Sequence, residues 1–316
     1  MRIVRPPDLG YKARERGPRE FRSRPSRKEG TLMTIAKREV VTIPPTFRIK
    51  DAAELMVDRR IRRLPVVHPG TGRLLGILIT RDLINFLGGG EKYKIVEEKF
   101  RGNFAAAVNQ PVSFIMSEEP IYATNQMSIE DGIRLLLRTG VGGVPILDEQ
   151  EKVVGIVSER DFLHYLPEVT GNPVSYYMTR HPFVLAPSDP IKKACTEMIS
   201  RGVRRLPVVE GKRLVGIVTS VDLLRYFGTS RIFEEMPSGK VEEALRREVS
   251  GIMTKNPVTI SPERDVGEAA SLMIQKGCGG LPVVEEERLE GIITEHDMLK
   301  LLVPWKSEAS TLSRSP

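Results

Sequence analysis

A short polar motif that could hold a ligand occurs four times in this sequence. Three copies place a hydroxyl side chain three residues before an aspartate: Ser158 and Asp161, Thr219 and Asp222, Thr294 and Asp297. A carboxylate can accept hydrogen bonds from both hydroxyls of a ribose, and a hydroxyl at a helix start lies beside free N–H groups that suit a phosphate. The motif therefore suits a nucleotide.

The first copy departs from this pattern. It has Ile79 at the hydroxyl position and Thr80 one place later, before Asp82, which weakens the expectation of a phosphate contact there. The same spacing also suits a capping box, which stabilises a helix without any ligand. Because Glu or Gln is the usual partner in that box, an aspartate in all four copies favours the ligand interpretation.

Arginine and glycine alternate at a second position. Upstream of each aspartate, copies one and three carry a basic pair and copies two and four a glycine pair: Arg62-Arg63, Arg204-Arg205, Gly142-Gly143 and Gly279-Gly280. The even copies instead place Arg160 and His296 directly before the aspartate. The charges suit a phosphate, although solvated helix and turn ends are the alternative. Glycine permits close approach of the backbone to a ligand, or ends the preceding helix.

Each motif closes a unit of strand, helix, strand, strand and helix. In the third copy, an apolar run at 183–185 precedes a helix whose apolar stripe runs from Ile191 to Ile199, followed by a hairpin at 206–218 and a second helix from Thr219 to Phe227. In every copy a proline follows the first apolar helix residue by sixteen positions: Pro65, Pro145, Pro207 and Pro282. A repeated spacing of this kind indicates a repeat protein.

Paired repeats are expected, because one unit of about 55 residues buries little surface alone. The aspartates are separated by 79, 61 and 75 residues, which pairs copy one with two and three with four. We expect a basic disordered leader at 1–33 and a tail at 305–316. The repeats are predicted at 34–88, 112–168, 174–229 and 249–304, with partly helical connectors at 89–111 and 230–248.

The sequence from the Leu-Pro-Val-Val strand to the Gly-Ile-Val-Thr-x-x-Asp motif resembles the CBS domain, the cystathionine beta-synthase regulatory repeat. Repeats of that family pair into Bateman modules. The chain is similar to archaeal stand-alone proteins of four CBS repeats and to the gamma subunit of AMP-activated protein kinase. The resemblance implies an α/β (α+β) fold with two Bateman modules in a disc, and bound adenine nucleotide (AMP, ADP or ATP) in clefts between paired repeats.

The resemblance also assigns residues to that ligand. It implies ribose contacts from the four aspartates and phosphate contacts from the three hydroxyls, namely Asp82, Asp161, Asp222, Asp297, Ser158, Thr219 and Thr294. Phosphate-binding basic groups would be Arg62 and Arg204 with the adjacent Arg63 and Arg205, and Arg160 and His296 in the even repeats. Gly143 and Gly280 would approach the edge of the adenine.

Composition limits the other classes of function. The net charge of +7 over 316 residues lies almost wholly in residues 1–30, where ten basic residues face four acidic ones. Two cysteines make no disulfide framework and no apolar run could span a membrane, so we expect a cytoplasmic protein. Four scattered histidines lack metal-ligand spacing, which argues for a non-catalytic protein without a catalytic cofactor.

Several alternatives remain open. The first is an S-adenosylmethionine-type ligand in place of a nucleotide. The second is nucleic-acid binding through the basic leader, which the near-neutral body and the lack of a recognised reader motif oppose. A regulated partner protein and a homodimer are both compatible with the sequence, which names neither.

Overall fold

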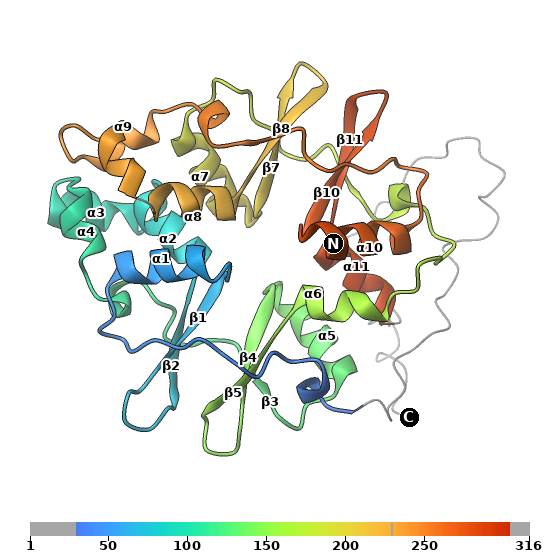
Figure 1. The fold of residues 1–316 in the computed structure, drawn as a ribbon, viewed down its shortest axis with the longest axis horizontal. Helices are drawn as coiled ribbons and strands as arrows, with labels where there is room; N and C mark the ends of the chain where they lie inside the picture. Colours follow the sequence, from blue (N-terminus) through green and yellow to red (C-terminus); the bar gives the residue numbers. More distant parts are fainter. Residues whose placement is uncertain (1–29, 229, 304–316) are drawn as a thin grey trace, which may run out of the picture.

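The computed structural model describes residues 30–228 and 230–303, and four repeats of one architecture surround a common centre (Figure 1). Repeats 1 and 2 occupy the lower half of the view, and repeats 3 and 4 the upper half. Repeat 1 therefore lies diagonally opposite repeat 4, and repeat 2 opposite repeat 3. No helix among the described residues is long and apolar enough to cross a bilayer.

Each repeat consists of a helix, an antiparallel hairpin and a second helix. Repeat 1 contains α1 (Ile49–Asp58), β1 (Arg63–Val67), β2 (Leu74–Ile79) and α2 (Thr80–Leu87). Repeat 2 contains α5 (Ile129–Thr139), β4 (Gly143–Leu147), β5 (Val153–Ser158) and α6 (Glu159–Phe162). Repeat 3 contains α7 (Ile191–Arg201), β7 (Arg205–Glu210), β8 (Arg213–Thr219) and α8 (Ser220–Phe227). Repeat 4 contains α10 (Val266–Lys276), β10 (Gly280–Glu285), β11 (Arg288–Thr294) and α11 (Glu295–Leu302).

Repeat 3 shows why the sequence folds in this way. The apolar stripe of α7 is buried, and the helix ends at Gly202, whose φ of 68° is the left-handed conformation that glycine adopts readily. The predicted hairpin and second helix are confirmed. The predicted strand at 183–185 was wrong, because Leu185 alone forms a parallel bridge with Val208, and Pro187 follows two residues later.

Backbone pairing links repeat 1 to 2 and repeat 3 to 4, which is the predicted pairing of the repeats. In the second pair, β11 pairs with β8, and each also binds a short strand from the start of the other repeat, β6 (Thr179–Arg180) and β9 (Thr254–Lys255). In the first pair, β3 (Ala123–Thr124) stays within repeat 2, beside β4. The two repeats are linked there by isolated bridges, such as those joining Lys37 to Ile156 and Ile77 to Ser117.

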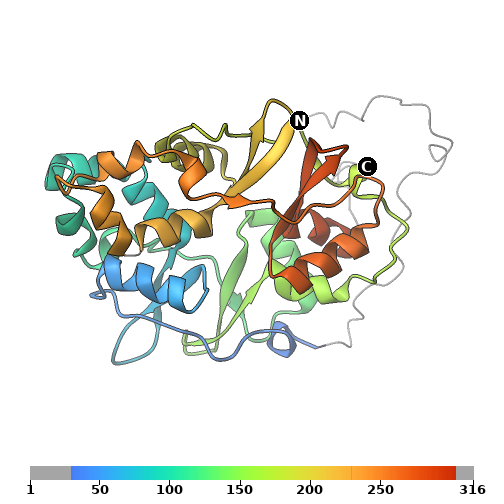
Figure 2. The same cartoon turned by 45° about the horizontal axis from the view of Figure 1, so that its top comes forward.

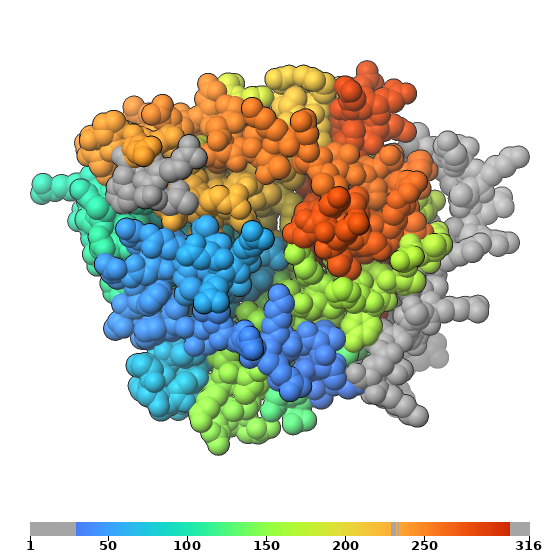
Figure 3. All heavy atoms as spheres, viewed as in Figure 1, coloured from blue at the N-terminus to red at the C-terminus, as the bar shows by residue number. Residues whose placement is uncertain are grey.

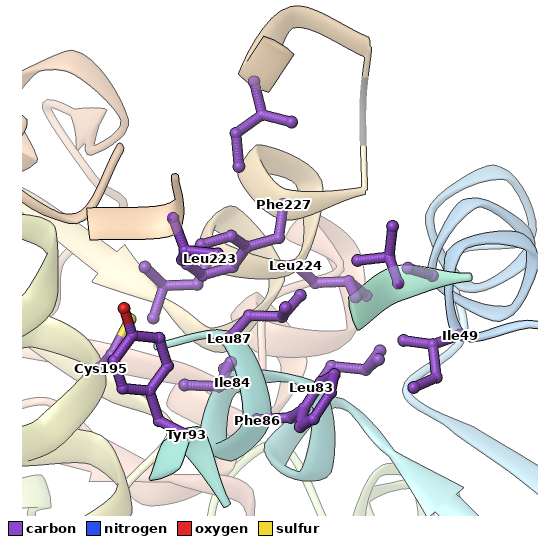
Figure 4. Close-up of a cluster of buried hydrophobic side chains, with 14 of the residues drawn as sticks. Ile49, Leu83, Ile84, Phe86, Leu87, Tyr93, Cys195, Leu223, Leu224 and Phe227 are labelled. Atoms are coloured by element: carbon purple, nitrogen blue, oxygen red, sulfur yellow. The ribbon is translucent and has the colours of Figure 1, made fainter. Parts of the chain in front are cut away.

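The hydrophobic cores run across the two modules. One core combines repeats 1 and 3, where α2 packs against α7 and α8, and Figure 4 shows Leu83, Leu87, Leu223 and Leu224 meeting there. The other combines repeats 2 and 4, where α11 packs against α5 and α6. Figure 2 shows these two groups of helices on opposite sides of the molecule. The modules are thus fixed to each other by buried apolar surface.

The connectors contain helix, as predicted. The first forms α3 (Tyr93–Phe100) and α4 (Phe104–Val108), and the second forms α9 (Val241–Leu245) after a 3-10 segment at Ser230–Glu235. The connectors bind each other, because Phe104 N–H donates to Gly239 and Val241 N–H donates to Gly102.

The predicted leader lies outside the described residues except for its end, where the boundary needs correction. Leu32 begins a 3-10 turn (Leu32–Thr34), is fully buried in the core of repeats 2 and 4, and donates from its N–H to Met127. The folded body therefore includes residues predicted to belong to a disordered segment.

Candidate functional site

A cavity of about 580 Å³ lies where the four repeats meet. Figure 3 shows the face of the molecule on which they converge. Ser158 and Asp161 of repeat 2 line one part of the cavity, with Lys37, Val40 and Val41 from the start of repeat 1. The volume is within the range that binds small ligands in proteins.

A second part of the cavity has the same construction in the other module. Thr219 and Asp222 of repeat 3 line it, with Thr254, Pro257 and Val258 from the start of repeat 4. Each part thus combines a hydroxyl and a carboxylate with an apolar segment from the paired repeat. Polar groups opposite an apolar wall can hold a ribose and a flat base together.

The predicted hydroxyl and aspartate pairs form capping boxes. In all four repeats one aspartate oxygen, Oδ2, accepts from the N–H of the residue three places earlier, at 2.9 Å for Asp82, 2.7 Å for Asp161, 2.8 Å for Asp222 and 3.0 Å for Asp297. In repeats 2 to 4 the hydroxyl also donates to this oxygen. The argument that aspartate disfavours a capping box was therefore wrong.

The capping hydrogen bonds use Oδ2, so the second carboxylate oxygen of each aspartate, Oδ1, takes no part in the capping box. Asp222 Oδ1 lies 3.7 Å from Nη1 of Arg225, a side chain that is 62% exposed. Burial raises the pKa of Asp222, and its hydrogen bonds with Thr219 oppose that rise. One oxygen, rather than two, is available to ribose hydroxyls.

Asp82 and Asp297 lie outside the cavity, unlike Asp161 and Asp222. Both are almost fully buried, at 8% and 6% exposed. Asp82 Oδ1 lies 3.5 Å from Lys92 Nζ, and Asp297 Oδ1 lies 2.9 Å from Lys300 Nζ. The second oxygen is already paired in these two repeats. Thr294 and His296 also lie outside the lining of the cavity.

Seven arginines line the cavity. Two of them are Arg60 and Arg225, and the other five are predicted basic groups, which meet there: Arg62, Arg63, Arg160, Arg204 and Arg205. Burial and the adjacent guanidinium groups lower the pKa of Arg63 to about 9 and that of Arg205 to about 10. Both causes disfavour the charged form. An anion in the cavity would offset both, so the site suits phosphate.

Two buried carboxylates form ion pairs with three of these arginines. Glu159, the first residue of α6, is 1% exposed; its Oε1 lies 2.9 Å from His296 Nδ1, and its Oε2 accepts from Nη2 of Arg204. Burial raises the pKa of Glu159, but the hydrogen bond from His296 and the charge of Arg204 outweigh it and bring the pKa to about 2. This carboxylate joins repeats 2, 3 and 4.

Glu295, the first residue of α11, is the equivalent residue of repeat 4 and is fully buried. Its Oε1 accepts from Nε of Arg160 at 2.7 Å, and its Oε2 lies 3.7 Å from Nη2 of Arg62. Arg160 also donates to the carbonyl of Gly277 at 3.1 Å. This carboxylate joins repeats 4, 1 and 2, so both links cross the centre of the disc.

The glycine pairs leave room for protein atoms. A Cβ atom at Gly142 would overlap the guanidinium groups of Arg204 and Arg63, and one at Gly279 would overlap that of Arg205. Gly143 has a φ of 153° and lies against the carbonyl of Val157. Gly280 lines the cavity, where the predicted contact with a base stays a prediction.

The sequence assignments missed Glu159 and Glu295. Both occupy the variable position after the hydroxyl residue of the motif, where repeats 1 and 3 have Thr80 and Ser220. The alternation of glutamate with a hydroxyl residue was a readable signal. It matches the alternation of glycine and arginine pairs.

Four repeats of this architecture, arranged in two pairs around a ligand-sized cavity, define a class of repeat protein. The family model of the CBS domain matches residues 32–89, 112–168, 174–229 and 249–304, and the chain therefore belongs to the CBS-domain family. Proteins built from CBS pairs are generally regulatory rather than catalytic.

The chain is similar to archaeal proteins over most of its length. MJ1225, an uncharacterised protein of Methanocaldococcus jannaschii, is 37% identical over 273 residues, which cover 85% of this chain and 98% of the relative. Its crystal structure, described as that of a proposed archaeal homologue of g-AMPK, matches with a TM-score of 0.82 at 36% identity, over 86% of this chain and 100% of the other. An uncharacterised 33.4 kDa protein of Thermofilum pendens is 33% identical over 264 residues, 83% of this chain and 88% of the relative.

Proposed function

We propose that this protein is a non-catalytic sensor that binds an adenine nucleotide, AMP, ADP or ATP, in its central cavity. The observation that carries the proposal is the arginine-lined cavity with a hydroxyl and aspartate pair in each of two parts, at Asp161 and at Asp222. The likeness to a proposed archaeal homologue of g-AMPK supports an adenine base and a regulatory role.

Each chemical part of a nucleotide has a matching group in the cavity. Oδ1 of Asp161 or Asp222, which the capping box does not use, would accept a ribose hydroxyl, while Val41 or Val258 would cover one face of the base. The guanidinium groups would bind phosphate with charge-assisted, bidentate hydrogen bonds. Ligand binding would then favour one relative arrangement of the repeats, which a regulated partner protein could detect.

The charge of the cavity favours a nucleotide over S-adenosylmethionine. The sulfonium of that ligand is a cation, and seven arginines already line the cavity. A phosphate offsets this charge, whereas a sulfonium adds to it. The nucleic-acid alternative depends on residues 1–29, which lie outside the described part of the chain. We further propose a cytoplasmic location, in keeping with two cysteines that are both free.

Calorimetric titration of the purified protein with adenosine, AMP, ADP, ATP and S-adenosylmethionine tests this function. Asp222→Asn should weaken adenosine and AMP alike at the repeat 3 site by about tenfold or more, because a charge-assisted hydrogen bond contributes about 1.5–3 kcal/mol. Asparagine keeps an acceptor for the capping N–H, so the fold should survive.

Asp297→Asn is the matched control, since it makes the same change in repeat 4, outside the cavity. The affinities of this variant for adenosine and AMP should equal those of the wild type. Absence of heat with every adenine nucleotide would refute the proposed function. Equal losses in the two variants would place the ligand elsewhere.

A further inference from the structure

The centre of the disc holds two carboxylates to which the proposed function gives no role. Glu159 and Glu295 are buried and do not line the cavity, whereas their partners Arg204, Arg160 and Arg62 do. Each of these three arginines therefore contacts a buried carboxylate and also lines the cavity.

The positive charge at the centre exceeds the negative charge. Nine basic side chains line the cavity, whereas three carboxylates line it and the two buried glutamates lie beside it, an excess of four positive charges. Within the described part of the chain, Arg63 and Arg205 form no ion pair with a carboxylate. The internal anions thus compensate the cluster only in part, and a further anion remains favourable.

The link at Glu295 is the looser of the two. Its Oε2 is the single buried side-chain oxygen or nitrogen of the described residues that lacks a hydrogen-bond partner, and Nη2 of Arg62 is 3.7 Å away. An unsatisfied buried oxygen costs free energy, so this link holds Arg62 weakly. Arg62 can therefore leave Glu295 for a stronger acceptor at small cost.

We propose that Glu159 and Glu295 are internal anions that compete with ligand phosphate for the central arginines and so set the preference of the cavity for phosphorylated over unphosphorylated nucleosides. The inference rests on the proposed function. Phosphate and carboxylate both accept bidentate hydrogen bonds from a guanidinium group, so a phosphate in the cavity draws Arg204 or Arg62 away from its glutamate.

The exchange has a structural consequence, because both links cross the disc. Arg204 of repeat 3 holds Glu159 of repeat 2, and Arg62 of repeat 1 holds Glu295 of repeat 4. A ligand can shift the arrangement of the modules only by its differential affinity for the two states. Phosphate supplies that difference by replacing a contact between modules with a contact to the ligand. Adenosine, which has no phosphate, leaves both links intact.

Glu159→Gln and Glu295→Gln test the competition by calorimetry with adenosine and AMP. Glutamine keeps a similar shape but removes the charge, so the ratio of AMP affinity to adenosine affinity should rise about tenfold, with adenosine itself unchanged. Glu285→Gln is the control for net charge, because Glu285 is exposed at the end of β10. It should leave the ratio unchanged.

A second variant shows whether the effect passes through the ion pair. In an Arg204→Gln background, Glu159→Gln should no longer raise the ratio, because the arginine for which carboxylate and phosphate compete is gone. An unchanged or lower ratio of AMP affinity to adenosine affinity in the folded single variants would overturn the inference. Glutamates that merely orient the arginines would help AMP to bind, so their removal would weaken AMP binding.

Failure of the proposed function gives a different result. The wild type would then bind neither adenosine nor AMP, and inorganic tripolyphosphate becomes the probe. The Glu159→Gln/Glu295→Gln double variant should bind tripolyphosphate about tenfold more tightly than the wild type. Equal affinity of the two proteins would overturn the internal-anion inference without reference to any nucleoside.

Discussion

Glu159→Gln should reveal how much the central carboxylate stabilises the ligand-free protein. The pKa of Glu159 is lowered from 4.5 to about 2, because His296 and Arg204 outweigh the effect of burial. A difference of about 2.5 pKa units, at about 1.36 kcal/mol each, corresponds to about 3 kcal/mol of stability at pH 7. This magnitude applies to a side chain that is 1% exposed, where solvent screening is small.

The pH dependence of this stability has a defined sign. A carboxyl whose folded pKa is depressed stabilises the fold at pH values above its unfolded pKa, near 4.5, and loses that contribution as the pH falls through about 2. The variant should therefore be about 3 kcal/mol less stable than the wild type at pH 7. The gap should narrow below about pH 4.5 and close near pH 2.

Urea denaturation at constant ionic strength, followed at pH 7, 5, 3 and 2, measures the gap. The control Glu285→Gln removes an exposed carboxylate and should change the free energy of unfolding by less than about 0.5 kcal/mol. A gap that stays constant from pH 7 to pH 2, or a variant as stable as the wild type at pH 7, would contradict the role given to this ion pair.

Two further substitutions test the surroundings of the site. Gly142→Ala should weaken AMP binding about tenfold and leave adenosine binding unchanged, because a Cβ atom at this position would overlap the guanidinium group of Arg204 and shift it. Calorimetry measures both affinities. The control is Gly251→Ala, where a Cβ atom meets nothing within 4 Å, and it should change neither affinity. Asp265→Ala should lower the free energy of unfolding by about 1–2 kcal/mol in urea, because this N-cap residue of α10 also accepts from the N–H and hydroxyl of Thr170. An unchanged denaturation midpoint would exclude that cap.

The repeated unit was predictable because its signals are local and occur four times. The stripe of α7, its glycine end and the hairpin that follows all lie within about 30 residues, and the structure reproduces them. The single bridge that Leu185 forms in place of a strand was not predictable in the same way. The apolar residues at 183–185 read as a strand, but only one residue pairs with β7.

The centre of the site could not be read from the sequence in the same detail. Arg160 and Glu295 are 135 residues apart, and Arg204 and Glu159 are 45 residues apart, so only the packing of the modules brings them together. Packing also decides which of the four aspartates line the cavity and which pair with a lysine outside it. Lys92, which pairs with Asp82, comes from a connector ten residues away, whereas Lys300 follows Asp297 on the same helix and could have been noticed.

A crystal structure grown with saturating AMP tests the central claim most directly. Binding in the cavity predicts a nucleotide whose ribose hydroxyl lies within about 3 Å of Oδ1 of Asp161 or Asp222, with its phosphate on Arg62, Arg63, Arg204 or Arg205. The links from Arg204 to Glu159 or from Arg62 to Glu295 should be lengthened or broken. A cavity without nucleotide at saturating AMP, or a nucleotide bound only at Asp82 or Asp297, would contradict it.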